Sequence, residues 1–218
     1  MALGVGMIGS VVEGPGEIEA VPNLLARTIS KLGHVDFYPD RPMNAHGIGN
    51  LTTAGGIERF VRAAFAQPKC AGVMVLVDSD GQCPVTLACA LVARIRAMGL
   101  QRPVAVVVAN VMFETWFVAG ADALAGRRMG VRSGIAAGVT SPDEPELIGS
   151  PKLWLSERML NGRTYKESID QVALTRLLNL DEVKAKSRSF QRLESAVATL
   201  ISDAIAARAT VTPNCANE

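Results

Sequence analysis

The sequence has few aromatic residues and almost no net charge. Aromatic side chains make up 5% of its 218 residues, and the formal net charge is +1 at pH 7. Such a small net charge excludes the strong long-range field that steers many proteins to nucleic acids or membranes. A nucleic-acid substrate would therefore need a local basic patch or a partner protein to attract it. The apolar residues that are present are largely Ala, Val and Leu, as is typical of parallel α/β folds.

Cysteines are scarce and long apolar runs are missing. The four cysteines, Cys70, Cys83, Cys89 and Cys215, include no Cys-x-x-Cys pair and no spacing typical of zinc sites. We therefore predict reduced thiols and a cytoplasmic location. No apolar run approaches the roughly 20 residues that cross a bilayer, so no membrane partner is expected. Residues 1–10 lack a basic segment ahead of an apolar stretch, so they predict a first strand rather than a signal peptide.

The usual nucleotide-binding motifs are missing as well. The turn Gly14-Pro15-Gly16 is not followed by the Gly-Lys-Ser/Thr ending of a phosphate-binding loop. It does not fit the pattern Gly-x-Gly-x-x-Gly either. The sequence thus argues against direct ATP hydrolysis and against dinucleotide binding.

Short apolar runs alternate with helical patterns in the first half of the chain. Residues 5–12, 34–38, 71–77 and 103–109 predict strands, and residues 18–32, 54–65 and 85–98 predict helices. This order predicts an α/β fold with a parallel, right-handed sheet flanked by helices. We place this core in residues 1–125.

The second half of the chain has a different pattern. Residues 126–218 predict an irregular excursion followed by a helical C-terminal extension packed on the core, including a long amphipathic helix over 190–207. Thr164 and Glu167 have capping-box spacing. Residues 39–53 are predicted as a loop, and the tail from residue 210 as frayed.

Acidic side chains follow two of the predicted strands. Glu13 and Glu17 come after the first, and Asp78 and Asp80 after the third. Ligands of open parallel sheets bind outside the carboxyl ends of the strands, and alternate side chains of a strand share a face. Crowded carboxylates repel one another, and a divalent cation such as Mg²⁺ (or Mn²⁺) relieves this repulsion. The alternative is that these acids form turns or cap helices.

Three further groups are weaker candidates. Glu114 follows the fourth strand and could act as a second metal ligand or general base, or could simply be an acid favoured at a helix start. Lys152 could neutralise a phosphate or a developing charge, or could be a solvated lysine. A phosphate-binding patch, or else ordinary basic surface residues, is predicted for Arg127, Arg128 and Arg132 in a Gly-rich loop, with Arg41, Arg59 and Arg62 elsewhere.

The same motifs carry a resemblance to known families. Val11-Val12-Glu13-Gly14 with Val75-Leu76-Val77-Asp78-Ser79-Asp80 resembles the Toprim pattern of topoisomerases, primases and overcoming-lysogenization-defect nucleases. Over residues 5–200 the chain resembles a bacterial Toprim-like family, domain of unknown function 4276. The motifs that carry this closer resemblance are Val12-Glu13-Gly14 with Glu17, Asp78-Ser79-Asp80 with Cys83-Pro84, Ala109-Asn110 with Phe113-Glu114 and Trp116-Phe117, Lys152, Tyr165, Asp170-Gln171, and Ser189-Phe190 with Arg192.

The resemblance implies a Toprim-like sheet and a Mg²⁺-dependent nuclease or phosphodiesterase. Glu13, Asp78 and Asp80 would be metal ligands or proton handlers. No tyrosine is placed like the nucleophile of topoisomerases, which favours hydrolysis by water. The family further implies the effector of a bacterial anti-phage defence complex with an ATPase partner, as part of an oligomer. The alternative is a non-catalytic Toprim-like scaffold subunit that docks onto an ATPase or another assembly.

Overall fold

The fold is built on a parallel β-sheet. A computed structural model describes residues 6–130 and 133–215. Within these residues the strand order is β2-β1-β4-β5-β8, and β3 also pairs with β1, next to the end of the pairing with β2. Every pairing in this sheet is parallel, as the sequence predicts. The strands are β1 (Gly6–Val12), β2 (Phe37–Pro39), β3 (Met43–Asn44), β4 (Cys70–Asp78), β5 (Val104–Ala109) and β8 (Val211–Thr212).

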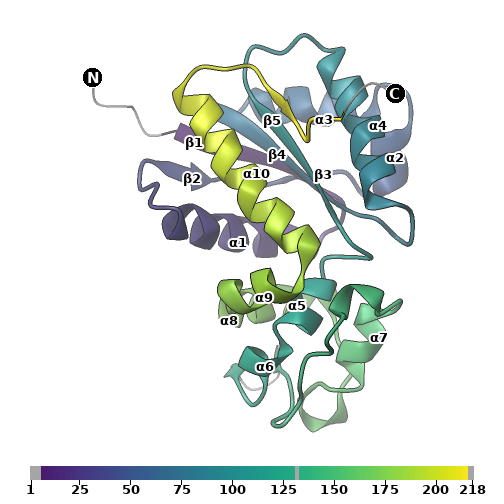
Figure 1. Cartoon of the computed structure of the whole chain (residues 1–218). Helices are drawn as coiled ribbons and strands as arrows, with labels where there is room; N and C mark the ends of the chain where they lie inside the picture. The colour runs from purple at the N-terminus through teal and green to yellow at the C-terminus, as the bar shows by residue number, and fades with distance from the viewer. Residues whose placement is uncertain (1–5, 131–132, 216–218) are drawn as a thin grey trace.

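Both faces of the sheet are covered by helices. Alternate residues of each strand point to opposite sides, so each face contributes its own set of apolar side chains. Ile8, Met74 and Val107 belong to one apolar cluster, whereas Met7 and Val75 belong to the other. Helices α1 and α10 pack on the first face, and α2, α3 and α4 cover the second (Figure 1). Their bounds are α1 (Glu17–Lys31), α2 (Ile48–Thr52), α3 (Gly56–Phe65), α4 (Pro84–Arg96) and α10 (Arg188–Ile205).

The segment between β5 and α10 forms a group of short helices at one end of the sheet (Figure 1). It also contains the two-stranded hairpin of β6 (Arg128–Met129) and β7 (Ser133–Gly134). The helices are α5 (Thr115–Ala119), α6 (Ala121–Leu124), η1 (Pro145–Leu147), α7 (Pro151–Ser156), η2 (Leu160–Gly162), η3 (Glu167–Gln171), α8 (Val172–Leu177) and α9 (Leu180–Lys186). None of the described helices is long and apolar enough to cross a membrane.

Three local predictions are wrong. The predicted loop 39–53 contains β3 and α2, which are too short to show a hydrophobic period. The capping box predicted from Thr164 is not formed, because the residue before η3 is Lys166 and its side chain makes no cap. The tail is not frayed over residues 210–215, the part that the structure describes, since β8 extends the sheet beside β5.

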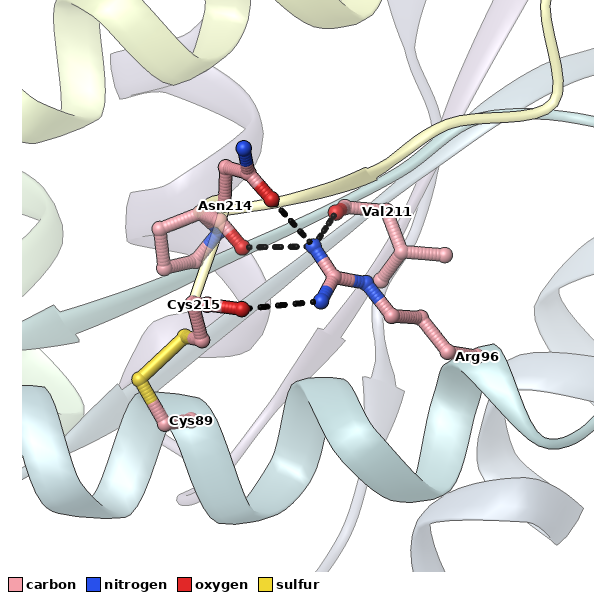
Figure 2. Close-up of a disulfide and its surroundings, with 6 residues drawn as sticks. Cys89, Arg96, Val211, Asn214 and Cys215 are labelled. Atoms are coloured by element: carbon pink, nitrogen blue, oxygen red, sulfur yellow. Dashed lines mark hydrogen bonds between the residues drawn. A yellow bond between two sulfur atoms is a disulfide. The ribbon is translucent and has the colours of Figure 1, made fainter. Parts of the chain in front are cut away.

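The tail is also attached to α4, which corrects the prediction of four reduced thiols. Cys89 and Cys215 form a disulfide with a Cα–Cα distance of 5.6 Å, and Cys70 and Cys83 are free. Arg96 of α4 donates hydrogen bonds to the carbonyl oxygens of Val211, Pro213 and Cys215 and to the side chain of Asn214 (Figure 2). Cysteines 126 positions apart give no sign of this pairing in the sequence.

Candidate functional site

The carboxyl ends of β1 and β4 lie side by side and bring two predicted acids together. Val12 is in register with Leu76, so Glu13 leaves β1 where β4 reaches Asp78. The backbone N–H of Asp78 donates a hydrogen bond of 3.3 Å to Oε2 of Glu13. Both side chains are half-buried. Residues 65 positions apart therefore meet at this edge, as the sequence predicts.

Glu17, the first residue of α1, is buried beneath the loop that joins β1 to this helix. Its Oε2 accepts hydrogen bonds from the backbone N–H groups of Glu13 at 2.9 Å and Gly14 at 2.8 Å. Its Oε1 is buried and has no hydrogen-bond partner among the described residues. Glu17 therefore shapes the loop with one oxygen and keeps the other available.

Gly16 lets η3 approach this loop closely. A Cβ at this position would lie 2.1 Å from Oε1 of Gln171, which is itself buried without a partner among the described residues. Only a residue without a side chain fits between the start of α1 and η3. η3 is more than 150 positions away in the sequence, and this close approach places it against the loop that joins β1 to α1.

The segment between β5 and α5, which leads to Glu114, donates backbone hydrogen bonds to two side chains at the end of β4. Oδ1 of Asp78 accepts a hydrogen bond of 2.8 Å from the N–H of Phe113. Oγ of the buried Ser79 accepts one of 2.9 Å from the N–H of Val111, which has a positive φ of 61°. Glu114 follows directly and is buried, and its Oε1 accepts a hydrogen bond of 3.0 Å from the hydroxyl of Tyr165.

Asp80 lies at the rim of this group. β4 ends at Asp78, and Asp80 is exposed with a positive φ of 47°. The alternation of side chains along a strand therefore does not orient it relative to Asp78. Asp80 acts on the other acids through its negative charge, which raises the pKa of Glu13.

Burial makes the carboxyl groups of this site difficult to ionise. Loss of solvation raises the pKa of Glu13, Glu114 and Asp78, that of Asp78 well above its ordinary value. The same cause raises the pKa of Glu17 to about 8, and repulsion from Glu114 adds to it. Asp78 is further affected by the negative charges of Glu17, Glu114 and Glu13. We call Glu13, Glu17, Asp78 and Glu114 the acidic cluster.

Lys152 provides positive charge beside the acidic cluster. It lies in the first turn of α7 and forms an ion pair with Glu167 of η3. Burial by itself lowers the pKa of Lys152, but attraction by Glu114 and Glu167 outweighs it and the net shift is upward. Lys152 also interacts electrostatically with Glu13 and Asp78. The structure thus brings the predicted lysine to the predicted acids.

The described residues contain no group of three or more His, Cys, Asp and Glu side chains arranged to hold a metal ion. Mg²⁺ does not require such a group, because it usually keeps several waters and binds one or two carboxylates plus phosphate oxygens of a substrate. Glu13 and Asp78, which are both half-buried residues, and the unpartnered Oε1 of Glu17 fit this open kind of site. Their raised pKa values also fit it, because a dication would stabilise their ionised forms.

Sequence reasoning missed one contributor and left another without a role. Glu167 is the ion-pair partner of Lys152 rather than a capping residue. Gln171, which the sequence singles out only within a motif of the resemblance, covers Gly16. The adjacent Asp170 accepts hydrogen bonds from both terminal nitrogens of Arg163. No local pattern distinguishes these roles, because they depend on how η3 packs against the start of α1.

Comparisons with known proteins support one assignment. A search among curated proteins finds no match to the chain. The family model described as "Domain of unknown function (DUF4276)" matches residues 12–198, which include every residue of the acidic cluster as well as Lys152 and Tyr165. The chain therefore belongs to the DUF4276 family.

Proposed function

We propose that this protein is a Toprim-like, Mg²⁺-dependent phosphodiesterase that hydrolyses nucleic acid with water as the nucleophile. The observation that carries the proposal is the acidic cluster: four carboxyl groups from three separate segments, all with raised pKa, beside one lysine. Like charges are gathered at such a cost in free energy mainly at functional sites. The order strand-Glu and strand-Asp-x-Asp, which resembles the Toprim pattern, agrees with this reading.

Each residue of the site would have its own role in the reaction. Glu13 and Asp78 would hold the cation, with Asp80 at the rim, and Glu17 would hold the loop and offer its second oxygen. The cation, when bound, supplies charge neutralisation and lowers the pKa of bound water. Lys152 would stabilise negative charge that develops on the phosphate. Glu114, whose pKa is raised by burial, would exchange a proton, and Tyr165 would orient it.

Metal dependence tests the proposed function directly. Purified protein, stripped with EDTA, is incubated with labelled single-stranded and double-stranded DNA and RNA. We expect hydrolysis with Mg²⁺ or Mn²⁺ and none with EDTA alone, because the phosphodiester needs the dication to offset its charge. Mg²⁺ should also raise the melting temperature, and more so at pH 8 than at pH 5, because bound carboxylates must be ionised. Equal melting temperatures with and without Mg²⁺ at both pH values would contradict the proposal.

The resemblance also leads us to propose a setting for this activity: the effector of an anti-phage complex, in an oligomer with an ATPase. A scaffold role is the second candidate, and exposed apolar side chains in the C-terminal helical group favour it. Leu147 and Leu153 are 72% and 59% exposed there. If the protein is only a scaffold, the acidic cluster is dispensable and Leu153→Ser separates the complex. If it is the nuclease, the acids are required even where the complex stays intact.

We place the protein in the cytoplasm, where disulfides are rare. Because the structure pairs Cys89 with Cys215, this location is tested by whether that disulfide is present in living cells. Acid-quenched cells are treated with an alkylating reagent and compared with air-oxidised protein by mass spectrometry. The exposed Cys83 is the internal control, because it should be alkylated in both samples. Finding the Cys89–Cys215 bond already formed in quenched cells would contradict the location.

A further inference from the structure

A basic cavity lies away from the acidic cluster, between α1 and the junction of α8 with α9. Its volume is about 680 Å³, and it is broadly open to solvent. Four cations line it: Arg27 and Lys31 from α1, Arg127 from the segment after α6, and Arg176 from α8. Asp181 is the acidic residue in the lining.

Asp181, the acidic residue of the lining, is already paired with Lys31. Lys31 forms ion pairs with Asp181 and with Glu194 of α10. Among the described residues, no carboxylate forms an ion pair with Arg27, Arg127 or Arg176. Three guanidinium charges in the cavity are therefore left without an ion-pair partner in the described part of the chain.

Backbone contacts hold two of these guanidinium groups in place. Arg27 donates to the carbonyl oxygens of Thr175 and Leu178, and Arg127 donates to that of Leu177 at 3.2 Å. Both are thus fixed to one turn at the end of α8, where their charges repel each other. Partial burial, and then the charge of Arg127, lowers the pKa of Arg27. An anion in the cavity would relieve this repulsion.

Arginine favours one kind of anion in such a place. Its planar, always charged fork matches the oxygens of a phosphate and can donate two parallel hydrogen bonds. The cavity is open and unsuited to enclosing a small apolar ligand. An extended polyanion that passes across the surface fits it better, because only one or two of its phosphates need to enter.

The cavity is connected to the acidic cluster by two elements. α1 begins with Glu17 and reaches Arg27 ten residues later, about 15 Å along the axis at 1.5 Å per residue. η3 and α8 run from Gln171, beside Gly16, to Arg176. One strand of a duplex carries a phosphate about every 3.4 Å of its axis. The separation thus corresponds to about four phosphates.

From these observations we propose that Arg27, Arg127 and Arg176 anchor the phosphate backbone of a nucleic acid whose scissile phosphate lies at the acidic cluster. The inference rests on the proposed function and names its substrate contact. It also explains how a chain of almost zero net charge attracts a polyanion: the positive charge is local. Arg127 is the residue of this cavity that the sequence indicated, whereas Arg132, predicted beside it, lies outside the described residues.

The test uses the double variant Arg127→Gln/Arg176→Gln, because Arg27 supports the end of α8. Binding of a fluorescent 20-nucleotide single strand is followed by anisotropy in EDTA. We expect about a tenfold or larger loss of affinity and a shallower dependence of log affinity on log salt, lowered by roughly 1.4 for two lost contacts at about 0.7 each. The control is Arg59→Gln/Arg62→Gln on α3, across the sheet, which removes the same charge.

Each outcome separates the inference from the proposed function. Equal losses in both double variants, no binding of the strand by the wild type, or equally tight binding of AMP would overturn the anchor. Weakened binding in the cavity variant alone supports it, even if Mg²⁺ then produces no hydrolysis. In that case the proposed reaction fails while the binding site stands. If the wild type hydrolyses the strand and the cavity variant binds it as tightly as the wild type does, the proposed reaction stands and the anchor is wrong.

Discussion

Replacing Asp78 with asparagine is expected to lower Mg²⁺-dependent hydrolysis by about 10²- to 10³-fold, the range found for losing one group that stabilises transition-state charge. The side-chain oxygen of asparagine can still accept the hydrogen bond from Phe113 that holds the β5–α5 connection. The variant therefore loses the charge and keeps the contact. Initial rates at saturating Mg²⁺, with the fold checked by circular dichroism, measure the effect.

The matched control for Asp78→Asn is Glu19→Gln. Glu19 is exposed on α1, two residues from Glu17, and its replacement removes one negative charge as well. It should leave the rate within about twofold of the wild type. If Asp78→Asn were as active as Glu19→Gln, Asp78 would not hold the cation, and the assignment of the acidic cluster as the reaction centre would be wrong.

Replacing Glu17 with glutamine should change how stability depends on pH. The pKa of Glu17 has its ordinary value of 4.5 in the unfolded chain, and burial raises it to about 8 in the folded chain. Between these values the folded state holds a proton that the unfolded state has lost, so stability falls as pH rises through this window. Glutamine stays neutral and removes this loss. The free energy of unfolding of the variant minus that of the wild type should rise by a few kcal/mol, taking about 1.4 kcal/mol per pKa unit.

The measurement is urea unfolding in EDTA at pH 5 and at pH 9. Glutamine can accept both hydrogen bonds of Glu17 through its oxygen, although its amide is placed where Oε1 has no described partner. That fixed cost is the same at both pH values and cancels in the difference. Glu19→Gln is again the control and should show no such pH dependence. A difference that does not grow from pH 5 to pH 9 would show that Glu17 is ionised in the fold without penalty.

Features that depend on residues close together in the sequence could be predicted, and features that depend on residues far apart could not. Glu13 and Asp78 each follow a buried apolar run, and parallel strands end at one edge of a sheet, so local sequence predicted their meeting. Asp80 was harder to place, because the strand ends before it and the turn decides its direction. The disulfide and β8 depend on contacts more than 100 positions apart, for which the sequence has no local signal.

The sequence alone determined the main alternation of strands and helices through residue 109 and the acids at two strand ends, because the hydrophobic period and the Gly and Pro residues that end each element act over a few residues. Only the tertiary structure decided that Glu114, Lys152 and Tyr165 meet these acids, and that Arg27, Arg127 and Arg176 share a cavity. Those groups come from separate segments: Glu114 and Lys152 are 38 positions apart, and Arg127 and Arg176 are 49 positions apart. Their approach depends on how the short helices pack at the end of the sheet, where close fit rather than local pattern selects the arrangement.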